Sequence, residues 1–164
     1  MWGKGFWRSL EKYLETLYVS GIQHSHHLLR VRCLNAAVKS AKIAWAFVEL
    51  RCTFGGRSIV PDLTVFCWER IPRNENGGVA NVFALAPDWT LEILSPGQSQ
   101  TKVTKNILHC LQHGTQMGWL IDPIEQTVFV YAPEPPTQFY DEPAASLPVP
   151  AFAETVRLQR VTRS

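Results

Sequence analysis

Two acidic residues stand inside segments that otherwise have the character of buried β-strands. Asp62 lies in "SIVPDLTVF" and Glu92 lies in the middle of "WTLEILSPG". An unpaired charge in an apolar strand is costly, so each acid needs a partner or a function. Because side chains alternate faces along a strand, Asp62 shares a face with Thr64 and Phe66.

A polar loop at residues 73–81 separates the two predicted strands, and we expect them to pair as neighbours. Asp62 and Glu92 would then meet near one end of the sheet. Adjacent carboxylates repel each other unless a cation lies between them, and Mg²⁺ binds through one or two carboxylates, waters and a phosphate. Such an ion stabilises charge on a phosphodiester and helps generate the attacking hydroxide. The pair therefore predicts a Mg²⁺ site, which Mn²⁺ could also fill.

Basic side chains follow the second strand, on a predicted amphipathic helix at residues 99–113. Lys102 and Lys105 are three residues apart on one helical face, and His109 and His113 continue that stripe. A lysine that reaches over the sheet edge could orient the water or neutralise the scissile phosphate. The structural alternative is a solvated helix face, and we expect the two histidines at the surface.

Each acid also has an interpretation without chemistry. Asp62 follows a proline, and Pro-Asp is common in turns where the carboxylate binds backbone. Glu92 is harder to explain in this way, because a buried glutamate is rare unless it is paired. Glu49 could add a third acid near the metal, although a salt bridge on the strand face is favoured. Asp88, in a second Pro-Asp pair, is interpreted as the loop that enters the strand.

The order of predicted elements is helical, then three strands, one helix and two strands, which indicates a mixed α/β fold. Gly114 is placed to end the predicted helix. The predicted organisation has three parts: a divergent helical region at 1–44, a core at 45–133 and a Pro-rich tail at 134–164 that lies on the surface.

Composition indicates a soluble globular domain. The chain has 164 residues, of which 46% are hydrophobic and 18% charged, and a net charge of +2 is too small to indicate a nucleic-acid partner by itself. Its four cysteines form no CxxC pair, which argues against a zinc knuckle or a disulfide scaffold. No apolar run approaches the roughly 20 residues of a membrane span. We expect a cytoplasmic protein without membrane contact.

The segments "IVPDLTVF", "LAPDWTLEILSPGQSQTKVTKNILHCLQHG", "GWLIDP" and "TVFVYAP" together resemble the Uma-type restriction endonuclease family. These are bacterial proteins with a PD-(D/E)XK nuclease fold, and the resemblance covers roughly residues 45–133. It implies a restriction-endonuclease-like core, with a central mixed sheet flanked by helices. It also implies that Asp62 and Glu92 are the active-site acids of a Mg²⁺-dependent phosphodiester hydrolase, and we expect DNA as its substrate. Because nucleases that cut both strands usually need two active sites, a homodimer is a fair expectation.

The sequence departs from the family pattern at the lysine, because Leu94 stands where the E-x-K motif has its lysine. In this family the lysine is placed on the helix, where Lys105 and Lys102 are the candidates and Asn106 is the next aligned position. The N-terminal region also lacks the usual acidic motif, and the ending "RLQRVTRS" lacks a closing helix. These departures favour an alternative function, an inactive nuclease-fold remnant with at most weak nucleic-acid binding.

Overall fold

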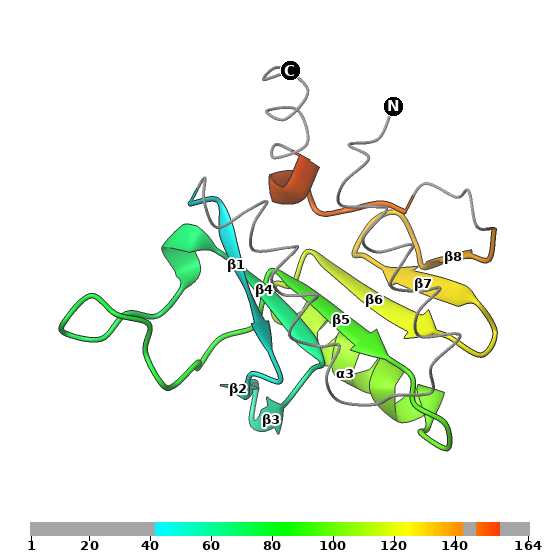
Figure 1. Ribbon diagram of the computed structural model, residues 1–164, viewed down its shortest axis with the longest axis horizontal. Coiled ribbons are helices and arrows are strands. Elements are labelled where there is room, and N and C mark those ends of the chain that lie inside the picture. Colours follow the sequence, from blue (N-terminus) through cyan, green and yellow to red (C-terminus); the bar gives the residue numbers. More distant parts are fainter. Residues whose placement is uncertain (1–41, 143–146, 155–164) are drawn as a thin grey trace.

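The computed structural model describes residues 42–142 and 147–154, and within these ranges the main feature is one six-stranded sheet (Figure 1). Its strand order is β1-β4-β5-β6-β7-β8, and β5 and β6 are parallel while the other neighbours are antiparallel. The predicted mixed sheet is confirmed. The described elements are β1 (Ala44–Val48), β2 (Cys52–Phe54), β3 (Arg57–Ile59), β4 (Leu63–Cys67), the 3₁₀ helix η1 (Trp68–Arg70), β5 (Trp89–Ile93), α3 (Gln100–Gln112), β6 (Met117–Asp122), β7 (Thr127–Tyr131) and β8 (Gln138–Tyr140).

The pairing of β4 with β5 positions the two acids. Leu63 lies opposite Leu91 and Thr64 lies opposite Thr90, so the predicted neighbour pairing is confirmed. One step further along this antiparallel register, Asp62 comes opposite Glu92.

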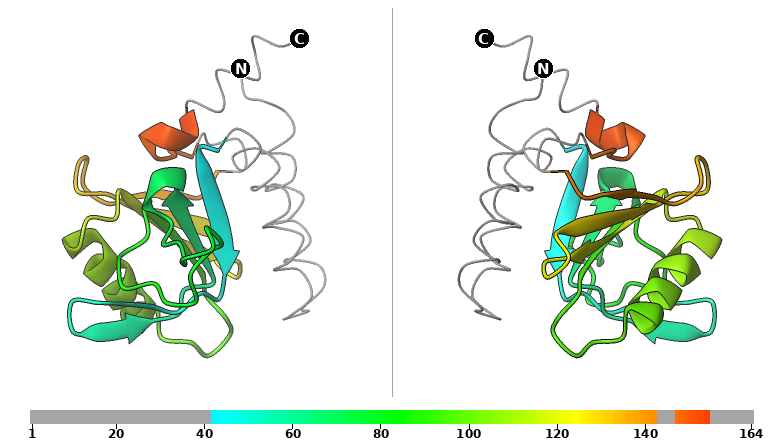
Figure 2. Two further views of the ribbon diagram at one scale, coloured as in Figure 1. Left: turned by 90° about the vertical axis from the view of Figure 1, so that its left-hand side faces the viewer. Right: turned by 90° about the vertical axis from the view of Figure 1, so that its right-hand side faces the viewer.

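Helix α3 connects the parallel strands β5 and β6 and covers one face of the sheet (Figure 2). Its start follows the prediction, because the Ser99 side chain accepts a hydrogen bond from the backbone N–H of Lys102 at 3.4 Å. Gly114 has φ +98° immediately after the helix, a conformation that favours glycine and ends the helix as predicted. Among the helices of the described ranges, none is long and apolar enough to cross a membrane.

A glycine in β6 lets α3 lie close against the sheet. Gly118 faces the helix, and a Cβ at this position would collide with the side chain of Ile107. Val103 and Ile107 pack there against Leu120 and Tyr131, all of them buried. This contact fixes α3 over β5 and β6, and therefore over the face of the sheet that carries Glu92.

The opposite face of the sheet carries the largest apolar cluster, which includes part of the predicted surface tail. Leu147 and Val149 are buried in this cluster beside Trp89 and Trp119. In addition, β8 pairs with β7 as the edge strand of the sheet. The prediction that this Pro-rich segment lies on the surface is wrong at these positions, because single apolar side chains can pack into the core even where the surrounding composition is Pro-rich.

The remaining domain predictions stay predictions. Most of the helical region expected at 1–44 lies outside the described residues, as do residues 143–146 and 155–164 of the predicted tail.

The predicted strand "SIVPDLTVFCW" is divided into two strands that belong to different sheets. Its first part, β3, pairs with β2 in a short hairpin, and its second part, β4, joins the main sheet. Pro61 lies between them, and a proline has no N–H to donate to a ladder. The hairpin turns at Gly55 and Gly56, as predicted, and lies on the same side of the sheet as α3 (Figure 2).

The prediction that His109 lies at the surface is wrong, because the hairpin packs against α3 at this position. His109, expected at the surface, is buried: its ring stacks on Phe54 with centroids 4.8 Å apart, and its Nε2 donates to the Phe54 carbonyl oxygen at 3.1 Å. The helix face was assigned without knowledge of the hairpin that covers it. His113 is exposed, as expected.

Candidate active site

The carboxylates of Asp62 and Glu92 each accept a hydrogen bond from a backbone N–H of the neighbouring segment. The backbone N–H of Ile93 donates to Oδ2 of Asp62 at 2.7 Å, and the backbone N–H of Asp62 donates to Oε2 of Glu92 at 3.3 Å. Each carboxylate therefore continues the β4–β5 ladder beyond its last regular pair. The structure brings the two acids together at the end of this ladder, while their roles in catalysis stay a prediction.

Burial and charge make Glu92 an unusual acid. It is only 7% exposed, and this burial, together with the nearby charge of Asp62, raises the pKa of Glu92 to about 8. The hydrogen bond from the backbone of Asp62 acts in the opposite direction, but it is the smallest of the three effects. In the absence of a cation, Glu92 therefore keeps its proton at neutral pH.

The oxygens of the pair suit a hard divalent cation. One oxygen of each carboxylate accepts a backbone hydrogen bond, whereas Oδ1 of Asp62 and Oε1 of Glu92 accept none from the described residues. Neither acid forms an ion pair within those ranges. Two such oxygen ligands fit Mg²⁺ or Mn²⁺, with both carboxylates ionised once the ion displaces the proton of Glu92.

The same residues do not form an all-protein metal cage. Within residues 42–142 and 147–154, no group of three or more His, Cys, Asp or Glu side chains is placed to hold a metal ion. A structural zinc site needs about four such ligands, whereas Mg²⁺ needs one or two carboxylates and keeps its waters. The pair is therefore a candidate for Mg²⁺ and not for structural zinc.

The structure does not join the predicted lysines to the acids. Lys102 and Lys105 are exposed on α3, and neither ammonium group makes a hydrogen bond or ion pair within the described part of the chain. Asn106, the next position, is half-buried and accepts a hydrogen bond from Nη2 of Arg57 at 2.7 Å. Sequence reasoning missed Arg57, although its place five residues before Asp62 is a signal that could have drawn attention to it.

Glu49 lies beside Asp62 through its backbone. Its N–H donates to the carbonyl oxygen of Asp62 at 3.2 Å, which extends the pairing of β1 with β4 by one position. The Glu49 side chain is exposed, and the favoured salt bridge is not found among the described residues. Glu49 is not among the groups that shift the pKa of Glu92, so we do not include it in the acid pair.

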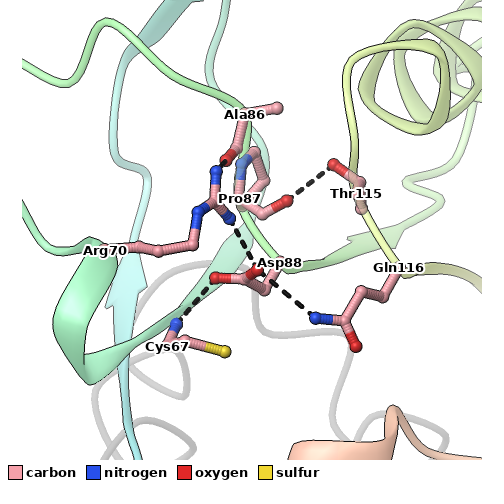
Figure 3. Close-up of polar contacts among 7 residues, drawn as sticks. All are labelled: Cys67, Arg70, Ala86, Pro87, Asp88, Thr115 and Gln116. Atoms are coloured by element: carbon pink, nitrogen blue, oxygen red, sulfur yellow. Dashed lines mark hydrogen bonds and ion pairs between the residues drawn. The ribbon is translucent and has the colours of Figure 1, made fainter.

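The second Pro-Asp pair forms a different kind of site at the other end of β5. Asp88 precedes β5, as predicted, but it is buried, and its carboxylate has three partners (Figure 3). Arg70 forms an ion pair with it at 2.6 Å, the backbone N–H of Cys67 donates at 2.7 Å, and the side-chain amide of Gln116 donates at 3.4 Å. This carboxylate is neutralised and serves the fold.

Comparisons with known proteins agree with this architecture. A family model, Uma2, described as "Putative restriction endonuclease", matches residues 15–160, a wider range than the resemblance in the sequence suggested. A crystal structure of a putative nuclease belonging to DUF820 from Anabaena variabilis is similar, with 60% identity and a TM-score of 0.77. The similarity covers 84% of this chain and 83% of that one. No curated protein matches. The chain therefore belongs to the Uma2 family of putative restriction endonucleases.

Proposed function

We propose that this protein is a Mg²⁺-dependent endonuclease that hydrolyses DNA phosphodiester bonds, with Asp62 and Glu92 as the metal ligands. The observation that carries the proposal is the acid pair itself. Two carboxylates meet in a buried place without a cation among the described residues, and the pKa of Glu92 is raised as a result. Membership of a restriction endonuclease family supports the nuclease class.

The chain's own groups would orient the site. When bound, Mg²⁺ would stabilise the charge that develops on the phosphodiester and lower the pKa of a water molecule. Asp62 and Glu92 would hold the ion, and the backbone N–H groups of Ile93 and Asp62 would keep each carboxylate in its orientation. Glu92 would release its proton when the ion binds, because a ligating carboxylate must be ionised.

The lysines belong to the proposal as the groups that orient the nucleophile or neutralise the phosphate. Lys105 and Lys102 lie on the helix that covers the Glu92 face of the sheet, and their side chains are long and exposed. Replacing both with alanine should lower the cleavage rate without changing metal binding. Unchanged rates in the double variant would remove them from the site.

Cleavage of supercoiled plasmid in Mg²⁺ or Mn²⁺ tests the proposal. The wild type should nick or cut the plasmid, Asp62→Ala and Glu92→Ala should abolish this activity, and EDTA should stop it. Glu75→Ala is the matched control, because Glu75 is an exposed acid in the loop between β4 and β5. Equal cleavage by the two site variants, or cleavage in EDTA, would refute the assignment.

The alternative is a nuclease fold without activity. The observation that favours it is the absence, within the described ranges, of any contact between a lysine and the acid pair. It predicts no cleavage and no effect of metal on the melting temperature. A metal-dependent rise in Tm that disappears in Glu92→Gln would count against it. A third possibility is a substrate other than DNA, since a fold does not fix a substrate.

The proposed setting is the cytoplasm, with a homodimer as the proposed assembly. The described cysteines Cys52, Cys67 and Cys110 are free and buried, which suits a reducing compartment. Two copies would bring two sites to the two strands of a duplex. Light scattering of the purified protein would test the dimer.

A further inference from the structure

We infer that Arg57, held in place by Asn106, binds the scissile phosphate and provides the fixed cation of the active site. This inference rests on the proposed function and gives it a specific substrate contact. Arg57 is the first residue of β3, and its Nη2 donates a hydrogen bond of 2.7 Å to Oδ1 of Asn106 on α3. The two residues are 49 positions apart in the sequence, so the contact depends on the fold.

The hairpin that carries Arg57 is anchored to α3 by aromatic contacts. Phe54, which pairs with Arg57 across the hairpin, stacks on His109 and makes an edge contact with His113 at 5.4 Å. At the turn, Gly55 has φ +56°, a conformation that favours glycine, and its Cα lies close against the ring of His113. The backbone of Arg57 is therefore fixed relative to the helix, and its guanidinium needs little ordering before it binds an anion.

Arg57 and the acid pair lie around the same part of α3. Cys110 follows Asn106 by four positions, one helical turn, and packs against Cys52 and Ile59 of the hairpin. Burial is the main cause of the raised pKa of the Cys110 thiol; the charge of Glu92 adds to it, and the charge of Arg57 opposes it weakly. The chain also runs directly from β3 through Pro61 into Asp62. Arg57, through Asn106, and Glu92, beside Leu120, therefore both lie on the side of the sheet that α3 covers, which is the side where a phosphate bound to the acids would be.

The charge of Arg57 is free to act on a ligand. A guanidinium has five N–H donors in a fork that matches phosphate oxygens, and the neutral amide of Asn106 takes one donor without cancelling the charge. No carboxylate pairs with the exposed Arg57 within the described residues. Arg70 is the contrast, because Asp88 neutralises it. The lysines of α3 carry charge too, but no described contact fixes them.

Two measurements on four variants test the inference. The first is the single-turnover rate of plasmid cleavage in Mn²⁺, and the second is the affinity for a short DNA duplex in Ca²⁺, followed by fluorescence anisotropy without turnover. Arg57→Ala should lower the rate about 100-fold, a typical effect of losing one charge-stabilising donor. It should also weaken duplex binding several-fold, while the Mn²⁺-dependent rise in Tm stays as in the wild type. Arg57→Lys should recover part of the rate.

Asn106 is a positioning residue, and a double-mutant cycle separates that role from a merely structural one. Asn106→Ala should slow cleavage by less than Arg57→Ala, and it should add no further loss when Arg57 is already alanine. Arg73→Ala is the matched control and should behave as the wild type. Arg73 is an exposed arginine stacked on Trp68, just beyond the end of β4 opposite Asp62.

The outcomes distinguish the inference from the proposed function. Wild-type rate and duplex affinity in Arg57→Ala, with Asp62→Ala inactive, would overturn the inference and leave the proposed function standing. Fully additive losses in the double variant would overturn the role of Asn106. A wild type that neither cuts nor binds DNA, and whose Tm is unaffected by Mn²⁺, would overturn the proposed function together with the inference.

Discussion

The two Pro-Asp pairs of this chain show how neighbours give the same dipeptide different roles. Asp62 enters β4 and Asp88 enters β5, and because these strands are antiparallel, the two acids lie at opposite ends of one ladder. Asp88 meets an arginine, a backbone N–H and an amide. Asp62 meets one backbone N–H and a second carboxylate, Glu92. At one end of the ladder an arginine compensates the carboxylate, whereas at the other end two carboxylates lie together without an ion pair among the described residues.

This difference follows from the cost of buried charge. A buried carboxylate is tolerated when a cation and hydrogen bonds compensate for its lost hydration, as around Asp88. At the other end no cation among the described residues compensates, and burial, followed by the charge of Asp62, raises the pKa of Glu92 and favours its protonated form. Acids with strongly shifted pKa values are common at functional sites. The charged form of such an acid is unfavourable in the free protein, and a bound cation can stabilise it. We therefore expect the two ends to respond in opposite ways to substitution.

The largest expected effect is a difference in cleavage activity between variants of the two aspartates. Asp62→Asn should lower metal-dependent plasmid cleavage by about 10³-fold, because a neutral amide is a poor ligand for a hard cation. Asp88→Asn should cut at a rate close to that of the wild type at a temperature where it remains folded. Gel assays of both variants at 15 °C would check this. Comparable losses in the two variants would remove the distinction between the two ends.

The free energy of unfolding should show the reverse order, with the larger loss for the variant of Asp88. Asp88→Ala leaves Arg70 and the N–H of Cys67 without their partner, and should lower the free energy of unfolding by about 3 kcal/mol. Asp62→Asn removes a repulsion with Glu92 and should cost far less in metal-free buffer. Urea unfolding at pH 7.5 measures both. A larger loss for Asp62→Asn than for Asp88→Ala would mean that the acid pair stabilises the fold and would contradict its proposed role as a metal site.

Metal binding should stabilise the protein through the acid pair alone. A ligand present at 100 times its Kd adds about 2.7 kcal/mol to the stability of the folded state. Mn²⁺ should therefore raise the Tm of the wild type and of Asp88→Asn, and should leave Glu92→Gln unchanged. Calorimetric scans with and without the ion test this expectation, and NaCl at matched ionic strength provides the control for simple ionic strength.

The pH dependence of metal binding should follow Glu92. Its pKa is raised from an ordinary value of 4.5 to about 8, so below pH 8 the ion must displace a proton. The affinity for Mn²⁺ should rise by up to about tenfold per pH unit between pH 6 and 8 and then level off. Isothermal titration across this range would show it. A flat profile would exclude a proton on Glu92 in the metal-free protein.

The last expected effect is on the stability of the metal-free protein. Between pH 4.5 and about 8 the unfolded chain has released the Glu92 proton and the folded chain has kept it. The free energy of unfolding should therefore fall as the pH rises through this window. Glu92→Gln should remove that dependence, so the variant should gain on the wild type most clearly at pH 8.5. Urea midpoints at pH 5 and pH 8.5 would measure the gain.

Sequence alone predicted the features that depend on neighbouring residues and simple periods. The alternation of side chains placed Asp62 and Thr64 on one face, and strands close in the chain paired as expected. The start of α3 at Ser99 and its end at Gly114 also follow from local rules. These features needed no knowledge of distant segments.

The features that sequence missed depend on contacts over long distances in the chain. His109 is buried because the β2–β3 hairpin folds back on α3, and the same contact brings Arg57 to Asn106. The partners of Asp88 come from two distant segments, one with Cys67 and Arg70 and one with Gln116, so its burial has no local signal. Leu147 is in the core although proline surrounds it. In each of these cases tertiary packing decides where the side chain lies.

Anomalous diffraction from crystals grown with Mn²⁺ tests the central claim most directly, because it locates the ion without any need for turnover. The account predicts a Mn²⁺ peak in contact with the carboxylates of both Asp62 and Glu92, and no peak at Asp88. A map without density between Asp62 and Glu92 at saturating Mn²⁺, or with the ion bound at Asp88, would contradict it.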